Sequence, residues 1–262
     1  NDLRSSGLTA RKRIETVISR AVFDELLKEK ENSPLMEALR AAMANMTMAN
    51  QIIFDSVNRR KSEVNVYKYE LEAMKRSYME NYCNSIDTLV QLLSEPTEGE
   101  IAELWRKTPY FPILERCEIK TMDQMDSIYP IDASYLYFFR TIPLQKETLD
   151  EVMSIYFEKL TDDNRERIRP MLALVKKTIA KSLRRFDILE FPSTIRNLFD
   201  DSHAARSGKD ESSAIFALAD RLDREAEELL SNADTLLSSE SVSDFCSNSA
   251  YNHPDDNIIM LP

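Results

Sequence analysis

Histidine and cysteine are the side chains best suited to metal binding or nucleophilic catalysis, and this chain has few of either. Its two histidines, His203 and His253, are far apart, and neither lies in an H-E-x-x-H or clustered Cys/His pattern. A hydrolase triad needs a positioned histidine, and the sequence has no G-x-S-x-G motif. We therefore predict no catalytic residue, no metal site, no cofactor and no small-molecule ligand, and we expect both histidines in solvated loops.

Three pairs of adjacent aspartates could act as a general acid and base, or could bind Ca²⁺. They are Asp162-Asp163, Asp200-Asp201 and Asp255-Asp256. Acid–base chemistry requires burial that separates the two pKa values. Each pair lies at a predicted helix end or in a loop, where helix capping or exposure to solvent explains it. An enzyme is accordingly the least favoured function.

A basic segment provides a stronger candidate for a contact surface. Residues 165–196 contain nine Lys or Arg and three Asp or Glu, although the whole chain has a net charge of −11. We predict a helix over 164–186 with its basic side chains opposite an apolar stripe. The candidate contacts are Arg165, Arg169, Lys176, Lys177, Lys181, Arg184 and Arg185.

Such a basic helix face is about 30 Å long and could contact a phosphate backbone. Because an acidic chain is an unfavourable starting point for a nucleic-acid binder, an adaptor that binds nucleic acid through 165–185 is the alternative function. The basic face could instead be solvated, or could pair with the acidic last helix that we predict over 210–237. The candidate carboxylates there include Asp220, Asp223 and Glu227.

Complementary charged faces in one chain also suit head-to-tail contacts between subunits, which can close into a ring. The C-terminal apolar residues Ile258, Ile259 and Met260 are further candidate subunit contacts. They could add to a neighbouring subunit as a strand or an anchor, or could dock on their own bundle.

Cysteine usage and hydropathy bear on location. Cys83, Cys117 and Cys246 are odd in number and have no C-x-x-C spacing, which suits a reducing compartment. No stretch approaches the ~20 apolar residues of a membrane span. We expect a cytoplasmic protein without a membrane partner. No signal-peptide pattern is visible, although the chain starts at Asn1 and not at Met.

Glycine is scarce, with three residues in 262, and this favours long helices over strand-rich folds. The stretch Pro34–Val57 is the most apolar, and it carries no charge from Ala41 to Phe54. We interpret it as a central helix wrapped by others. Minor β structure is expected as an extended piece at Val64–Val66 and a strand near Ile113–Ile119.

The fold class is thus mainly α, with four predicted regions. Residues 1–95 form a first helical unit, 96–143 a Pro-rich α/β connector packed on the bundle, 144–240 a second helical unit, and 241–262 an irregular tail ending in an apolar segment. Both units follow the order helix, central helix, break and long helix, so we predict an internal duplication of three-helix units.

The element boundaries follow from apolar periodicity and capping residues. Residues 1–8 are expected to be a disordered leader. Ser33 and Pro34 predict a helix start, and Thr121 with Gln124 predicts a capping box. The expected helices are 9–30, 34–57, 67–93, 100–106, 121–129, 144–160, 164–186 and 210–237.

Several short segments, in this order, resemble a known family. They are Phe23-Asp24-Glu25-Leu26, Ser33-Pro34-Leu35, Ala38-Leu39, Trp105 with Thr108 and Tyr110, Ile119-Lys120-Thr121, Ile131-Asp132-Ala133-Ser134 and Asn252-His253-Pro254-Asp255-Asp256-Asn257-Ile258-Ile259. Together they resemble an uncharacterised, mainly helical family of phage and prophage-like regions in gut anaerobic bacteria, whose members show a tandem half-repeat.

The resemblance spans most of the chain and carries no catalytic residue. It implies a non-enzymatic structural or assembly role through protein–protein contacts, as a connector or ring component. It also implies oligomerisation, other virion-like proteins as partners, and association with a virion.

Overall fold

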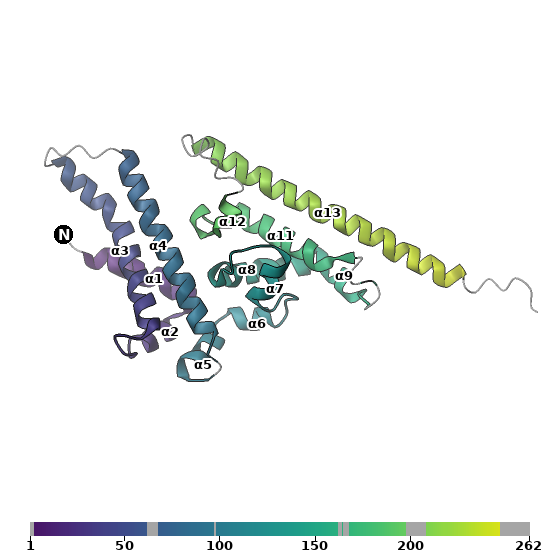
Figure 1. Cartoon of the computed structure of the whole chain (residues 1–262), viewed down its shortest axis with the longest axis horizontal. Helices are drawn as coiled ribbons and strands as arrows, with labels where there is room; N and C mark the ends of the chain where they lie inside the picture. The colour runs from purple at the N-terminus through teal and green to yellow at the C-terminus, as the bar shows by residue number, and fades with distance from the viewer. Residues whose placement is uncertain are drawn as a thin grey trace, which may run out of the picture.

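The computed structural model describes residues 3–61, 68–96, 98–161, 164, 168–197 and 208–246. These ranges are helical over most of their length and contain no strand, so the prediction of a mainly α fold is confirmed. Figure 1 shows two groups of helices that meet along α4. The extended piece predicted at 64–66 lies outside the described residues.

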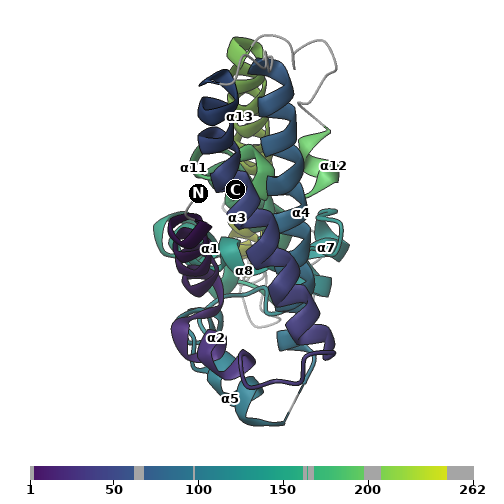
Figure 2. The same ribbon diagram turned by 90° about the vertical axis from the view of Figure 1, so that its left-hand side faces the viewer.

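The described part of the N-terminal half forms four helices: α1 (Leu3–Ile18), α2 (Arg20–Leu26), α3 (Pro34–Lys61) and α4 (Lys68–Ser94). Helix α3 packs against both α1 and α4, and Figure 2 shows α3 and α4 side by side along most of their length. The predicted helix start is confirmed, because Ser33 Oγ accepts a hydrogen bond from the Met36 amide at 3.2 Å.

Two N-terminal predictions are wrong. Residues 3–8 are not a disordered leader but the first turns of α1, where Ser6 is buried and its Oγ donates to Gln51 Oε1 at 2.9 Å. The single helix predicted over 9–30 is broken at Ser19, which has φ of 74°. The Ser19 hydroxyl accepts from the Val22 amide and so starts α2.

The expectation that α3 is covered on most sides is also wrong. Met36, Ala42 and Met46 are buried against α1 and α4, but the opposite face carries the exposed residues Ala41 and Met48. Met48 is 38% exposed. The uncharged stretch of α3 can leave such a face in solvent because a side chain as small as alanine presents little apolar area there.

The middle of the chain forms α5 (Glu100–Arg106), α6 (Tyr110–Leu114) and α7 (Met122–Ile128), and α5 agrees with the prediction. Trp105 is 1% exposed, and its ring lies 5.0 Å from Phe139 and 5.8 Å from Phe111. Thr121 Oγ1 caps α7 by accepting from the Gln124 amide at 3.1 Å. Aromatic side chains of this segment thus pack together with Phe139 of the following helix.

The strand predicted near Ile113–Ile119 is wrong. Its first residues belong to α6, and the rest is irregular chain. A buried side chain takes the place of a neighbouring strand: Gln145 Oε1 accepts from the Ile119 amide at 2.8 Å, and Gln145 Nε2 donates to the Ile119 carbonyl at 3.3 Å. The backbone polar groups are thus satisfied without a sheet.

The C-terminal half is centred on α11 (Pro170–Arg185), which packs against α8 and α13. The elements that the structure describes there are α8 (Tyr135–Thr148), the π-helix η1 (Leu149–Met153), α9 (Ser154–Glu158), α11 (Pro170–Arg185), the 3₁₀ turn η2 (Ile188–Glu190), α12 (Ser193–Arg196) and α13 (Gly208–Cys246). The predicted boundary at 143/144 falls inside α8, which contains Pro143. Helix α13 continues through residues 241–246, where the tail was expected to begin.

Helix α11 lies between α8 and α13 (Figure 1). Its predicted inward residues Val175, Ile179 and Leu183 are all buried, and so are Ala219 and Leu222 on α13. In each half the middle helix contacts an earlier helix, α1 for α3 and α8 for α11, and the long helix after it. This order agrees with the proposed duplication, which stays a prediction.

The packing of α11 predicts a contrast between a buried and an exposed aliphatic residue. Ile179 is fully buried, so Ile179→Ala should lower the free energy of unfolding by about 2–5 kcal/mol. Leu8 on α1 is 69% exposed, and Leu8→Ala should change the free energy of unfolding by no more than about 0.5 kcal/mol. Urea unfolding followed by circular dichroism measures both. Equal losses for the two variants would contradict this packing.

Candidate functional site

The basic face of α11 meets the acidic face of α13. Lys176 Nζ lies 2.6 Å from Glu225 Oε2. Arg184 reaches two carboxylates at once, with 2.7 Å from Nη2 to Asp220 Oδ1 and 2.7 Å from Nη1 to Asp223 Oδ2. Because the end of α11 pairs with the earlier part of α13, the two helices run antiparallel.

The other edge of α11 pairs with carboxylates that precede it in the sequence. Lys181 Nζ lies 2.8 Å from Glu147 Oε1 and 2.5 Å from Glu151 Oε2. The Arg185 guanidinium donates to both oxygens of Glu147, at 2.6 and 2.7 Å. Glu147 belongs to α8, and Glu151 belongs to the π-helix that continues it. The cations of α11 therefore link this helix to α8, to the π-helix and to α13.

These ion pairs lower the pKa values of the Glu147 and Glu225 carboxylates. The hydrogen bonds from Arg185 and Lys181 lower the pKa of Glu147 to about 2. The hydrogen bond from Lys176 lowers the pKa of Glu225. In both cases the partner stabilises the charged form.

The structure thus places most of the predicted contact residues in ion pairs within the chain, some with each other and some with Glu147, Glu151 and Glu225. Among the described residues, the second interpretation of the basic face holds, because its cations pair with the last helix and with α8. Lys177 completes the set, at 3.6 Å from Glu227. Arg169 is exposed and has a left-handed φ of 49°. Arg165, Ile258, Ile259 and Met260 lie outside the described residues.

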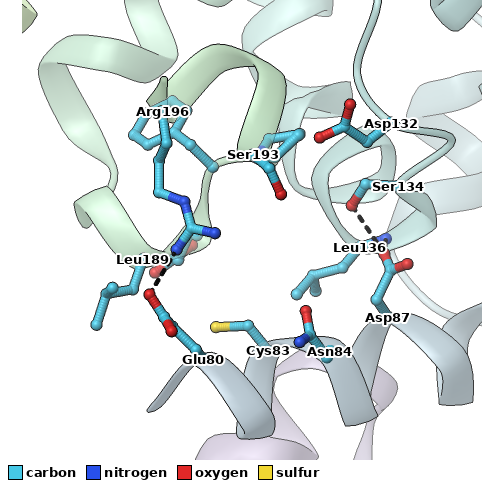
Figure 3. Close-up of a pocket in the computed structure, with 13 residues that line it drawn as sticks. Glu80, Cys83, Asn84, Asp87, Asp132, Ser134, Leu136, Leu189, Ser193 and Arg196 are labelled. Atoms are coloured by element: carbon cyan, nitrogen blue, oxygen red, sulfur yellow. Dashed lines mark hydrogen bonds and ion pairs between the residues drawn. The ribbon is translucent and has the colours of Figure 1, made fainter. Parts of the chain in front are cut away.

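A second feature is a polar hollow of about 120 Å³ between α4, the start of α8 and the segment 187–197, which we call the strap (Figure 3). Helix α4 contributes Glu80, Cys83, Asn84 and Asp87. Positions i, i+3, i+4 and i+7 share one side of a helix, which is why these four residues face the hollow together.

Hydrogen bonds fix the walls of the hollow. Asp87 Oδ1 accepts from Ser134 Oγ at 2.8 Å and from the Leu136 amide at 2.7 Å, so an α4 carboxylate caps α8 (Figure 3). Burial raises the pKa of Asp87, and these hydrogen bonds oppose that shift. On the opposite wall, Arg196 Nη1 lies 3.2 Å from Glu80 Oε1. The strap is therefore held to α4 by charge.

The turn before α8 is also tied to the strap. Asp132 and Ala133 have left-handed φ values of 56° and 51°. Asp132 accepts hydrogen bonds from the Thr194 amide, at 2.8 Å, and from the Thr194 hydroxyl. Asp126 Oδ1 accepts from the Ala133 amide at 3.2 Å. Hydrogen bonds to aspartate side-chain oxygens thus stabilise this turn in a left-handed backbone conformation, which glycine adopts more readily than other residues do.

The hollow does not have the chemistry of a nucleophilic centre. Burial raises the pKa of the Cys83 thiol to about 12, and Glu190 adds to this shift, so the thiol is protonated at neutral pH. Across the described ranges, no group of three or more His, Cys, Asp or Glu side chains could hold a metal ion. A hollow of this size is large enough to hold water molecules.

Sequence reasoning missed this hollow because its walls come from three separate segments. The one available signal was the row of polar residues Glu80, Asn84 and Asp87 beside the apolar stripe of α4. Both histidines and the three aspartate pairs lie outside the described residues.

Comparisons with protein-family models, with curated proteins and with solved structures give no match. Within the described residues, the helices are all too short or too polar to span a membrane.

The pKa of Glu147 predicts acid sensitivity of the contact between α8 and α11. Because its folded-state pKa is below the ordinary value of 4.5, the ion pairs stabilise the fold above pH 4.5, and this contribution is lost as the pH falls toward 2. Glu147→Gln should therefore be less stable than the wild type at pH 7, and the difference should shrink between pH 4.5 and 2. Urea titrations at several pH values measure it. A difference independent of pH would contradict the pairing.

The pairing of the basic face also predicts weak interaction with nucleic acid. Because the α11 cations from Lys176 to Arg185 already contact carboxylates, we expect no saturable binding of duplex DNA even at about 50 mM salt. Fluorescence anisotropy with a labelled duplex measures this. Binding that weakens steeply with salt, and is lost in Lys176→Glu, would instead favour the nucleic-acid adaptor.

Proposed function

We propose that this chain is a non-enzymatic, phage-like assembly protein that works through protein–protein contacts, as a connector or ring component. The observation that carries the proposal is the length of α13. Helix α13 has 39 residues and its partner α11 has 16. At ~1.5 Å per residue these helices are about 58 and 24 Å long, so α11 can cover less than half of α13.

The covered part of α13 can be located from its contacts. Ion pairs to α11 run from Asp220 to Glu227, and the Tyr156 hydroxyl of α9 donates to Asp234 at 3.1 Å. The helix then continues to Cys246, and Figure 1 shows this end extending past α9, clear of the other helices. A helix without a packed face is marginal in water, so this end favours a role in binding another protein.

Exposed apolar side chains near α13 also suit contacts with a partner. Phe216 on α13 is 52% exposed, and Val152 and Ile155, one turn apart at the π-helix and α9, are 43% and 50% exposed. Because Asp220, Asp223 and Glu227 pair within the chain, we assign the subunit contact to apolar surfaces in preference to the basic face. The order of short segments that resembles the phage-associated family supports the same function.

The test of this proposal is the mass in solution, measured by light scattering over a concentration series. We expect a discrete oligomer with a mass that is a multiple of 30.3 kDa. Phe216→Ser is expected to reduce the oligomer fraction, whereas Ala217→Ser, at the adjacent exposed position, serves as its control. A mass of 30.3 kDa at every concentration would contradict self-assembly.

A further inference from the structure

A groove of about 380 Å³ lies between α1, α3, α4 and the start of the strap. This volume falls in the range of roughly 300–1,000 Å³ that is usual for binding pockets. Its apolar part comprises Met46 and Met79, which are buried, together with the half-buried Ile188 and Leu189. Methionine side chains adapt to different apolar partners, which suits a surface that binds a peptide.

The edge of the groove carries cations. Lys75 is exposed, and it has no ion pair or hydrogen bond with the residues that the structure describes. Arg13 lies 3.9 Å from Glu190, which is at the limit of an ion pair. Arg76, Glu72 and Asp187 also line the groove, which is thus lined by three cations and two carboxylates. Lys75 is the cation most available to a bound carboxylate.

One polar group in the groove wall is left unsatisfied. The amide nitrogen Nδ2 of Asn50 is buried and has no hydrogen-bond partner among the described residues. An unpaired buried donor destabilises a structure. A rotation of the Asn50 amide toward the groove would let it donate to a backbone carbonyl of a bound segment, which relieves that cost.

We propose that this groove binds residues 255–261 of a neighbouring copy of the chain. This segment reads Asp-Asp-Asn-Ile-Ile-Met-Leu, with two acidic residues followed by four apolar ones. Asp255 and Asp256 match the cationic edge at Lys75, and the apolar residues match the surface formed by Met46, Met79, Ile188 and Leu189. The inference rests on the proposed self-assembly, and it identifies one interface between neighbouring copies of the chain.

The length of the chain favours a neighbouring copy over the same chain. Arg184, three residues before the groove residue Asp187, contacts Asp220 at 2.7 Å. The 26 residues from Asp220 to Cys246 span about 39 Å of helix, directed away from α3 and α4 (Figure 1). The nine residues from Cys246 to Asp255 can return at most about 32 Å. Asp255 therefore falls short of its own groove.

A contact between the tail of one copy and the groove of the next is heterologous, because the two surfaces differ. Repeated around an axis, such contacts close into a ring. The tail thus supplies the directional contact that a ring component requires.

The test uses full-length chain carrying Ile259→Asp, which weakens its own tail, and a fluorescent peptide of residues 255–261. Anisotropy should show saturable binding. Lys75→Glu in the groove should weaken binding about five- to tenfold, and Lys12→Glu, an exposed lysine of α1 outside the groove, should not. A peptide with Asp255→Lys and Asp256→Lys should bind the Lys75→Glu chain better than the unchanged peptide does.

Absence of saturable binding, or equal binding by the Lys75→Glu and Lys12→Glu chains, would overturn the inference. Light scattering separates this from failure of the proposed function. An oligomer fraction that Ile259→Asp and Lys75→Glu both leave unchanged at every concentration refutes the groove contact and leaves self-assembly in place. A monomeric chain that binds the peptide with the expected charge dependence supports recognition of the segment by the groove and refutes self-assembly.

Discussion

The C-terminal half depends on one constraint: α11 must bury two faces while it carries five cations between Lys176 and Arg185. The apolar residues Val175 and Ile179 are fully buried, and so the cations can lie only along the edges of the helix. Each edge receives carboxylates from a different neighbour, Glu147 on one side and Asp220 on the other. The charges therefore set which helices flank α11 and in which direction α13 runs.

The helices themselves were predictable from the sequence because their signals are local. Apolar spacing located α4 and α13, and Ser33 and Thr121 located two helix starts. Predictions from the sequence failed where a group that is distant along the chain determines the local backbone conformation. Gln145 satisfies the backbone of the expected strand from 26 residues away, and no local pattern records such a partner. The left-handed φ of Ser19 is similarly hidden in an otherwise helical sequence.

The candidate contact surface could be predicted only in part, because it too depends on groups that are distant in the sequence. Composition identified the basic helix and the acidic helix, but charge alone cannot distinguish a solvated face from a paired one. Glu147 and Glu151 gave no signal because their role depends on α8 and the π-helix lying against α11. The polar hollow was missed because Asp87 and Ser134, which lie 2.8 Å apart in the fold, are 47 residues apart in the chain.

The turn at Asp132 and Ala133 has a mechanical consequence. A non-glycine residue in a left-handed conformation costs about 1–2 kcal/mol, and here the hydrogen bonds of Thr194 and Asp126 offset that cost. If the strap leaves α4, Asp132 loses its partner, and the turn that orients α8 then relaxes as well. We therefore expect detachment of the strap and loosening of the start of α8 to be coupled, as parts of one cooperative unit.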